Sequence, residues 1–347
     1  MASVGGRSRK VMVSAAAKQT AMGTAQTVDS LLRVNSEPGA QQYEIDTDAE
    51  LVGGTEEMQD QEVSVRNYEM SISQNRCKPH TLATILASAM GSVTSATIAV
   101  SVWQHAITPK TARDFDLFTV EELITTGLQK QYADCFVDSF ELSLERRNFW
   151  DISGTILGSG KDATGSASVT EKSESSMHTR FTKAWLSAGT YDGSAPTQDM
   201  NLEDLTGSPD VVSAEIESLR WSYNNNTDQD FLWHFNSGLT WGRAERGDRN
   251  QTISMTLLMT RTTALTRILN QTDLALQLKA VNTDAVIAST YYEGGSIILP
   301  KIRYTSVNPR GLAGGRMVFE IEGNVLEHAT HGSALVWIWN GQTAYLA

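Results

Sequence analysis

The chain has 347 residues and a formal net charge of −12, with 28 Lys and Arg against 40 Asp and Glu. With 40% hydrophobic and 20% charged residues it has the composition of a soluble globular protein, which excludes a disordered, collagen-like or disulfide-stapled chain. The acidic excess repels phosphate and argues against sequence-specific nucleic-acid binding, unless the basic residues gather in one place.

The N-terminal region divides into a basic and an acidic block. Residues 1–42 lack a sustained period and carry five basic against two acidic residues, a net +3, which predicts a flexible arm. Residues 44–62 carry eight carboxylates and no basic residue. The two blocks are either solvated surfaces or a contact in which the arm of one copy lies on the acidic run of another.

Neither export nor membrane insertion is expected. Two cysteines, Cys77 and Cys135, are too few for a disulfide framework and are expected to be free thiols. The apolar run at 11–17 is too short for a secretory signal. The uncharged span 79–109 is rich in Ser and Thr and divided by Gly91, so it predicts a buried helix and then a strand. We therefore expect synthesis in a cytoplasm.

Two-residue alternation dominates from residue 63 onward and predicts strands. Helical spacing is confined to three segments, 79–91, 114–130 and 263–279. Residues 161–209 are poor in large apolar residues and predict a long loop or insertion. Strands are expected at 296–304, 316–326 and 334–345. The pattern favours a mainly β fold, a β-sandwich or barrel with one or two packed helices, over 43–330, with 331–347 as a closing strand or arm.

The clearest hairpin spans 136–156 and has two unlike faces. Its apolar face is predicted to carry Phe136, Phe140, Leu142, Leu144, Trp150, Ile152 and Ile156. Its polar face is predicted to carry Ser139, Glu141, Ser143, Glu145, Asp151, Ser153 and Thr155. A second, similar unit is expected over 212–259.

No motif for catalysis or cofactor binding stands out. Gly158–Lys161 lacks the earlier glycine and the following Ser or Thr of a phosphate-binding loop, so a turn explains it better. His328 and His331 fall in a predicted loop, where we expect no metal. Glu141 and Asp151 are compatible with a glycosidase pair, but a solvated sheet face explains them equally well. We expect no catalytic residue, no cofactor and no metal, which favours a structural protein.

The hairpin resembles a known family. Segments 132–143 and 149–160 resemble the first long hairpin of the major tail tube proteins of long-tailed bacteriophages. The second half of that family pattern is resembled by 219–226, 241–249, 297–302 and 318–326. The resemblance covers roughly 47–326 as an ordered pattern of strands and turns. The long arm, the 161–209 insertion and the extended C-terminal strand depart from compact members.

The resemblance implies a structural virion protein without enzymatic activity. Such subunits form hexameric rings that stack into a tube, and two hairpins of each subunit join a continuous inner barrel through which DNA is ejected. About 24 strands at about 4.8 Å spacing and a tilt near 40° give a backbone diameter of roughly 48 Å, wide enough for a duplex. The implied partners are further copies of the subunit and the tail tip, tape-measure and tail terminator proteins, with no membrane. The implied location is the virion tail, assembled in the host cytoplasm.

We expect the polar hairpin face to line the lumen. A wall of Ser, Thr, Asp and Glu repels phosphate and stays wetted, whereas rows of Lys or Arg hold DNA by counterion release. The alternative is that this face is the outside of a sandwich, because alternation decides which residues share a face but not what the face meets.

Other functions remain open at this point. One is another tail ring or head-to-tail connector protein of the same fold. A second is a hydrolase that depends on Glu141. A third is a carbohydrate-binding adhesin that uses Trp221, Trp233, Trp241, Trp337 and Trp339, although packing is the expected role of these residues. The lack of a visible repeat favours six single-fold subunits in a ring over fewer duplicated ones.

Overall fold

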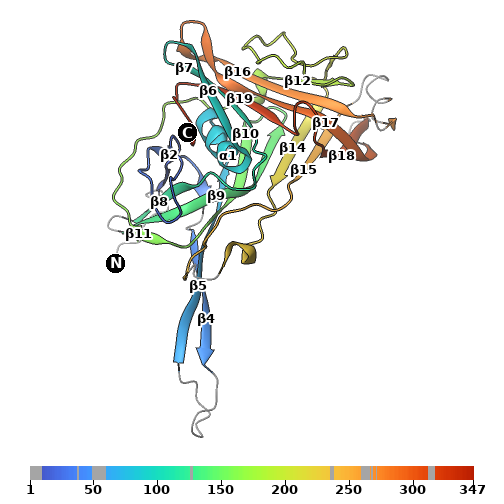
Figure 1. Cartoon of the computed structure of the whole chain (residues 1–347). Coiled ribbons are helices and arrows are strands. Elements are labelled where there is room, and N and C mark those ends of the chain that lie inside the picture. The colour runs from blue at the N-terminus through green and yellow to red at the C-terminus, as the bar shows by residue number, and fades with distance from the viewer. Residues whose placement is uncertain are drawn as a thin grey trace.

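The computed structural model describes residues 10–36, 39–48, 60–125, 128–234, 238–258, 266, 269–270, 272–311 and 317–347. The turn of the acidic block lies outside the described residues, as do 263–265, 267, 268 and 271 of the helix expected at 263–279. The C-terminal part of that expected helix is wrong, because residues 274–279 belong to the strand Leu274–Ala288. Antiparallel strands dominate, and one α-helix occurs in the described part of the chain (Figure 1). The predicted mainly β fold with a packed helix is confirmed.

The main sheet is open and antiparallel. Its strands, in spatial order, are β4 (Ala40–Asp48), β5 (Asp60–Gln74), β10 (Trp150–Gly158), β9 (Leu128–Glu145), β14 (Ile216–Asn224), β15 (Asn250–Leu257), β18 (Met317–Val325) and the C-terminal half of β17 (Tyr291–Gly311). The short β3 (Asn35–Ser36) pairs with β5 near its C-terminal end. The predicted hairpin is confirmed as β9 and β10.

A second sheet is built around the N-terminal half of β17, so this strand takes part in both sheets. On one side β17 pairs with β16 (Leu274–Ala288), which pairs with β12 (Thr182–Ser187) and, through it, with β13 (Asp210–Val211). On the other side it pairs with β19 (Leu335–Asn340), followed by β7 (Val102–Pro109) and β6 (Gly91–Ala99). The inner faces of the two sheets share one hydrophobic core, as a sandwich requires.

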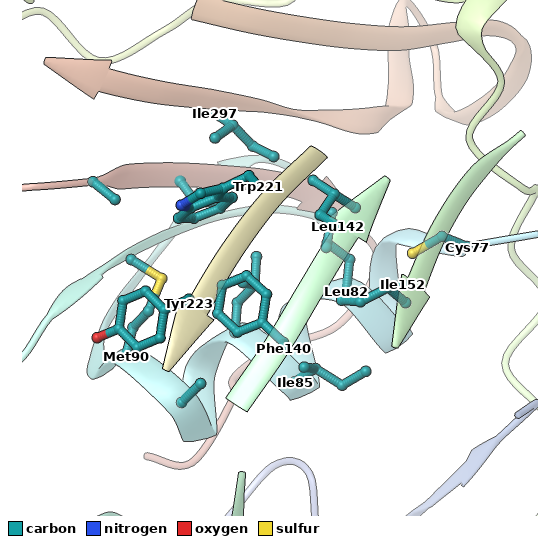
Figure 2. Close-up of a cluster of buried hydrophobic side chains, with 14 of the residues drawn as sticks. Cys77, Leu82, Ile85, Met90, Phe140, Leu142, Ile152, Trp221, Tyr223 and Ile297 are labelled. Carbon is teal, nitrogen blue, oxygen red and sulfur yellow. The ribbon is translucent and has the colours of Figure 1, made fainter. Parts of the chain in front are cut away.

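The helix α1 (Pro79–Met90) lies inside this core. Pro79 occupies its first turn, and Gly91 ends it with a φ of 85°, a left-handed conformation that glycine adopts without strain. All of its residues are buried. Figure 2 shows Leu82 and Ile85 of the helix beneath Phe140 and Leu142 of β9. The helix expected at 79–91 is confirmed.

A third, small sheet corrects two expectations. It contains β2 (Ser30–Leu32), β1 (Lys10–Val13), β8 (Phe118–Thr125), the N-terminal half of β9 and β11 (Asp162–Thr164). Residues 10–36 are therefore packed, whereas we expected a flexible arm. The helix expected at 114–130 is wrong, because this segment forms β8 and the start of β9. Neighbouring residues of β8 such as Thr119 and Val120 are both buried, so the strand lacks the alternation that identifies a half-exposed strand.

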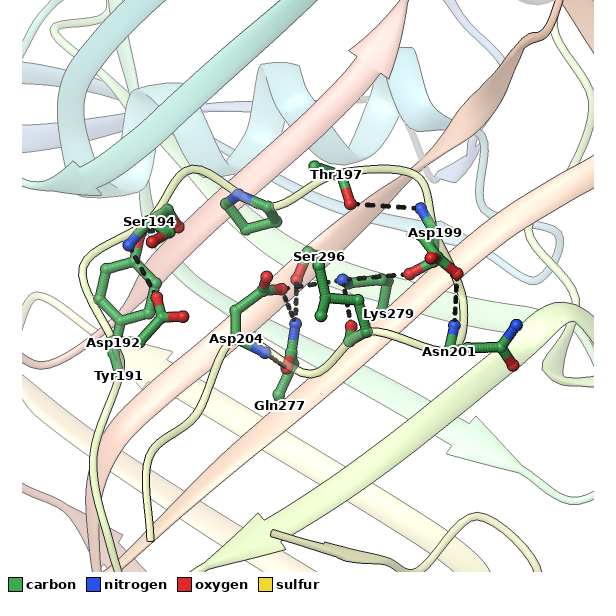
Figure 3. A network of polar contacts seen from close by, with 12 residues as sticks. Tyr191, Asp192, Ser194, Thr197, Asp199, Asn201, Asp204, Gln277, Lys279 and Ser296 are labelled. Atoms are coloured by element: carbon green, nitrogen blue, oxygen red, sulfur yellow. Dashed lines mark hydrogen bonds and ion pairs between the residues drawn. The ribbon is translucent and has the colours of Figure 1, made fainter. Parts of the chain in front are cut away.

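The segment expected to be a loop or insertion at 161–209 contains strands and a packed cover. Beyond β12, residues 188–209 lie across β16, where Lys279 of β16 forms a fully buried ion pair with Asp204, 2.8 Å from Nζ to Oδ2 (Figure 3). Lys279 also donates a hydrogen bond to the carbonyl oxygen of Leu202. Polar residues that bond to a sheet in this way look like loop residues in the sequence.

Candidate functional site

The β9–β10 hairpin displays the seven polar residues predicted to share one face. Its register places Ser139 opposite Thr155, Glu141 opposite Ser153 and Ser143 opposite Asp151. The residues between them, such as Phe140 and Leu142, are buried in the core. The full set, partly or fully exposed, is Ser139, Glu141, Ser143, Glu145, Asp151, Ser153 and Thr155. We call this side of the main sheet the polar face.

The polar face continues across the neighbouring strands. From Glu141 one row of the sheet passes through Ser222 of β14, Thr252 of β15 and Asn324 of β18. In the other direction Ser153 lies opposite Ser73 of β5. These residues were not predicted to share the face, although alternation in 216–224 and 250–257 carries the same signal. Six strands therefore contribute polar side chains to one row.

Carboxylates outweigh unpaired cations on this face. Arg220 Nε lies 3.3 Å from Glu141 Oε1, and Ser222 Oγ donates a hydrogen bond of 3.3 Å to Glu141 Oε2. Burial raises the pKa of Asp151, and the charge of Glu145 raises it further. The one arginine of β14 on this face is thus held by a carboxylate rather than left free to attract phosphate.

A β-bulge marks one end of the polar face. Ser139 pairs with Thr155 but Val137 pairs with Ile156, which leaves Asp138 without a partner residue. The bulge shifts the alternation by one, so Val137 joins the core that contains Phe140, whereas Phe136 packs in a separate cluster. There its ring stacks on Phe115 at 4.0 Å. Our placement of Phe136 beside Phe140 was wrong for this reason.

A concavity of about 1060 Å³ lies over the polar face. Its floor includes Glu141, Ser153 and Ser222, and Lys10 and Arg33 of the N-terminal segment border it. The lining combines these hydroxyl and carboxylate groups with apolar side chains, among them Leu31, Leu32 and Val34. Among the described residues no group of three His, Cys, Asp or Glu side chains is placed to hold a metal ion.

Three further sets of residues were considered from the sequence: a pair of histidines, the two cysteines and a pair of carboxylates. The rings of His328 and His331 stack on each other at 5.0 Å. Cys77 and Cys135 are free and buried, and burial raises the pKa of both thiols. Glu141 and Asp151 lie opposite serines rather than opposite each other.

The five tryptophans considered for glycan binding do not form an exposed platform. Four of them, Trp221, Trp241, Trp337 and Trp339, are buried, and Trp233 is half-buried. In the part of the chain that the structure describes, no helix is long and apolar enough to cross a membrane.

The described residues thus form an open β-sandwich with a continuous polar face on its main sheet. A model of the phage tail tube protein family matches residues 11–322. The match covers most of the chain, and the chain belongs to the phage tail tube protein family. A comparison with curated proteins gives no match. Membership in this family makes the chain a structural component of a virion tail. The family implies that copies assemble into a tube together with other tail proteins, and it suggests a non-enzymatic role.

Proposed function

We propose that this chain is the major tail tube subunit, which polymerises as stacked hexameric rings into a hollow tube through which the viral DNA passes during ejection. The observation that carries the proposal is the polar face, a row of polar side chains across six strands whose opposite side is buried in the core. The outer face of an ordinary β-sandwich is also solvated. This face is in addition continuous across six strands, its Arg220 is paired with Glu141, and it carries more carboxylates than unpaired cations.

The direction of the strands supports closure into a ring. From β4 to β17 eight neighbouring strands alternate in direction, so the two end strands run oppositely. Copies placed side by side therefore continue the same antiparallel pattern. Closure between copies also removes the free edges that long strands otherwise present to aggregation.

The polar face is proposed to line the lumen of this tube. Phosphates passing over Glu141, Ser153 and Thr252 meet hydroxyl groups and negative charge, so few counterions are released and DNA is not retained. The proposed partners are the tail tip, tape-measure and tail terminator proteins, with assembly in the host cytoplasm before the tube joins the virion.

Electron microscopy of the purified chain tests the assembly. Hollow tubes with a regular axial repeat are expected. Rings that never stack identify a tail ring or connector protein of the same fold, and persistent monomers at high concentration contradict the proposal.

Cysteine labelling tests the lumen. Because both native cysteines are buried, a single Ser153→Cys variant offers one accessible thiol. In assembled tubes this thiol is expected to react with a small maleimide but not with a maleimide on a large polymer. The control is Val286→Cys, at an exposed residue of β16 in the second sheet. Equal labelling of both variants by the large reagent contradicts a lumenal position for Ser153.

A further inference from the structure

Two arginines of the segment that leads into β15 converge on one backbone oxygen. The Nη2 atoms of Arg246 and Arg249 both donate hydrogen bonds to the carbonyl oxygen of Lys110, the residue after β7. Arg246 is 5% exposed and Arg249 is half-buried. Burial, and then the charge of Arg249, lowers the pKa of Arg246 to about 10. We call these two residues the arginine pair. Their like charges repel, and the repulsion is stronger where water is excluded.

No carboxylate forms an ion pair with the arginine pair among the described residues. Asp114 and Asp116 are held by the ammonium of Lys110, at 2.6 and 3.2 Å. Asp248 is held by Arg113 at 3.1 Å. These three carboxylates therefore already have cations of their own.

The remaining negative groups nearby are too weak or too distant to neutralise two cations. Glu327 is exposed and forms no ion pair with Arg249 among the described residues, although its charge opposes the lowering of the Arg249 pKa that burial causes. The C-terminal end of α1 lies close, because the N–H of Lys110 donates to the carbonyl oxygen of Met90 at 2.7 Å. The dipole of a helix corresponds there to only about half a negative charge.

Two donors beside the arginine pair have no acceptor in the described part of the chain. Arg249 Nε is buried without a hydrogen-bond partner, and so is the hydroxyl of Tyr223 on β14. Figure 2 shows Tyr223 beside Phe140, on whose ring it stacks at 5.1 Å. Burial raises the pKa of Tyr223 to about 12, and the charges of Arg249 and Arg246 act in the opposite direction, so their charges reach this hydroxyl. Buried donors and unneutralised cations together call for an anionic acceptor.

We propose that the arginine pair binds one small inorganic oxyanion of the phosphate class, which also accepts a hydrogen bond from the hydroxyl of Tyr223. The fork of a guanidinium group matches two oxygens of such an ion. The ion reaches the site from the side of Arg249, which is the more exposed of the two arginines. When bound, it joins the segment before β15 to the end of β7. The site requires neither DNA nor a second copy, so it is independent of the proposed function.

Binding of inorganic phosphate to the full chain tests the site. Equilibrium dialysis with radiolabelled phosphate at constant ionic strength is expected to give one phosphate per chain. Arg249→Gln is expected to weaken this binding by about tenfold or more. The matched control is Arg180→Gln, which removes an exposed arginine outside the site and should bind like wild type. Circular dichroism confirms that each variant is folded.

Two further variants separate the ion from a merely structural role of these residues. Tyr223→Phe keeps the ring that stacks on Phe140 and removes only the hydroxyl, and we expect it to weaken phosphate binding by about tenfold. Glu327→Gln removes a negative charge near Arg249 and is expected to tighten phosphate binding. Phosphate also stabilises proteins in general through exclusion from their surfaces, so a higher melting temperature counts only where Arg249→Gln lacks it.

Three results would overturn the inference. The first is a wild-type chain that binds no phosphate in dialysis. The second is equal affinity in wild type, Arg249→Gln and Tyr223→Phe. The third is binding by Glu327→Gln alone, because Glu327 is then the counter-charge of Arg249. None of these results bears on whether the chain forms tubes.

Discussion

Arg220 and Glu141 form an ion pair across neighbouring strands on the polar face, with 3.3 Å between Nε and Oε1. Both side chains remain partly exposed, so the pair contributes little to folding. Its consequence is electrostatic, since the carboxylate neutralises a cation that would otherwise face the proposed lumen.

Removal of this carboxylate should make the tube retain DNA. Glu141→Gln leaves one unpaired arginine per subunit, which can then contact a DNA phosphate. Each such contact makes the slope of the logarithm of the binding constant against the logarithm of the salt concentration steeper by about 0.9. We expect tubes of this variant to bind duplex fragments at low salt and release them at high salt. The control Glu141→Gln with Arg220→Gln should bind like wild type, and equal binding by all three proteins would refute the role of the pair.

The cover formed by residues 188–209 should depend on its buried ion pair. Asp204→Ala leaves the Lys279 ammonium buried without its carboxylate, and we expect it to cost about 3–5 kcal/mol in urea unfolding. Replacing both partners, Asp204→Leu with Lys279→Met, removes the charges together and should cost less. A double variant as unstable as the single one would show that packing, not charge, holds the cover.

Acid should destabilise the fold through two buried histidines. Burial lowers the pKa of His80 and of His105 to about 4, and His80 Nδ1 lies 2.9 Å from the hydroxyl of Tyr345. Because the folded pKa lies below the unfolded value of 6.5, their contribution is complete above that pH and is lost as pH falls toward 4.

A buried carboxylate opposes this trend. Burial raises the pKa of Glu174 to about 7, so its contribution is present below the unfolded pKa of 4.5 and is lost as pH rises through 7. Removing the group by Glu174→Gln should therefore make the loss of stability between pH 6.5 and 4 steeper. Thermal melts across this range test the sign, and a shallower acid slope in the variant would contradict it.

Gly160, in the turn Gly158–Lys161, should tolerate a side chain poorly, both because of its backbone conformation and because of the backbone packed against it. Gly160 has a φ of 77°, and a Cβ there would lie 2.8 Å from the backbone of Arg66. We expect Gly160→Ala to cost roughly 1–3 kcal/mol. Gly238→Ala, at a φ of 68° with no atom within 4 Å of the new Cβ, carries the strain alone and should cost less. Equal costs in denaturant unfolding would exclude the steric contribution.

Alternation predicted the parts of the fold that have one buried and one solvated side. The β9–β10 hairpin and its seven polar residues follow from this rule, and α1 follows from Pro79, Gly91 and the helical spacing between them. Whether the polar face lines a lumen stays a prediction, because the face of a single chain does not show what surrounds it.

The strands that were not predicted from the sequence lack this difference between a buried and a solvated side. β1 is too short to show a period, and β8 is buried on both sides, so neither carries a two-residue pattern. The position of Phe136 depends on the bulge at Asp138, which no local residue pattern marked. The cavity of about 320 Å³ beside the β9–β10 turn is lined by β9, β14, β16 and the segment around Arg180, which only the tertiary fold brings together.

The most direct test of the proposed function is a reconstruction of assembled tubes from electron micrographs that resolves side chains. We expect a closed antiparallel barrel in which Glu141 and Asp151 face the inner wall. Glu141 and Asp151 on the outer wall, or an assembly without a continuous channel, would contradict it.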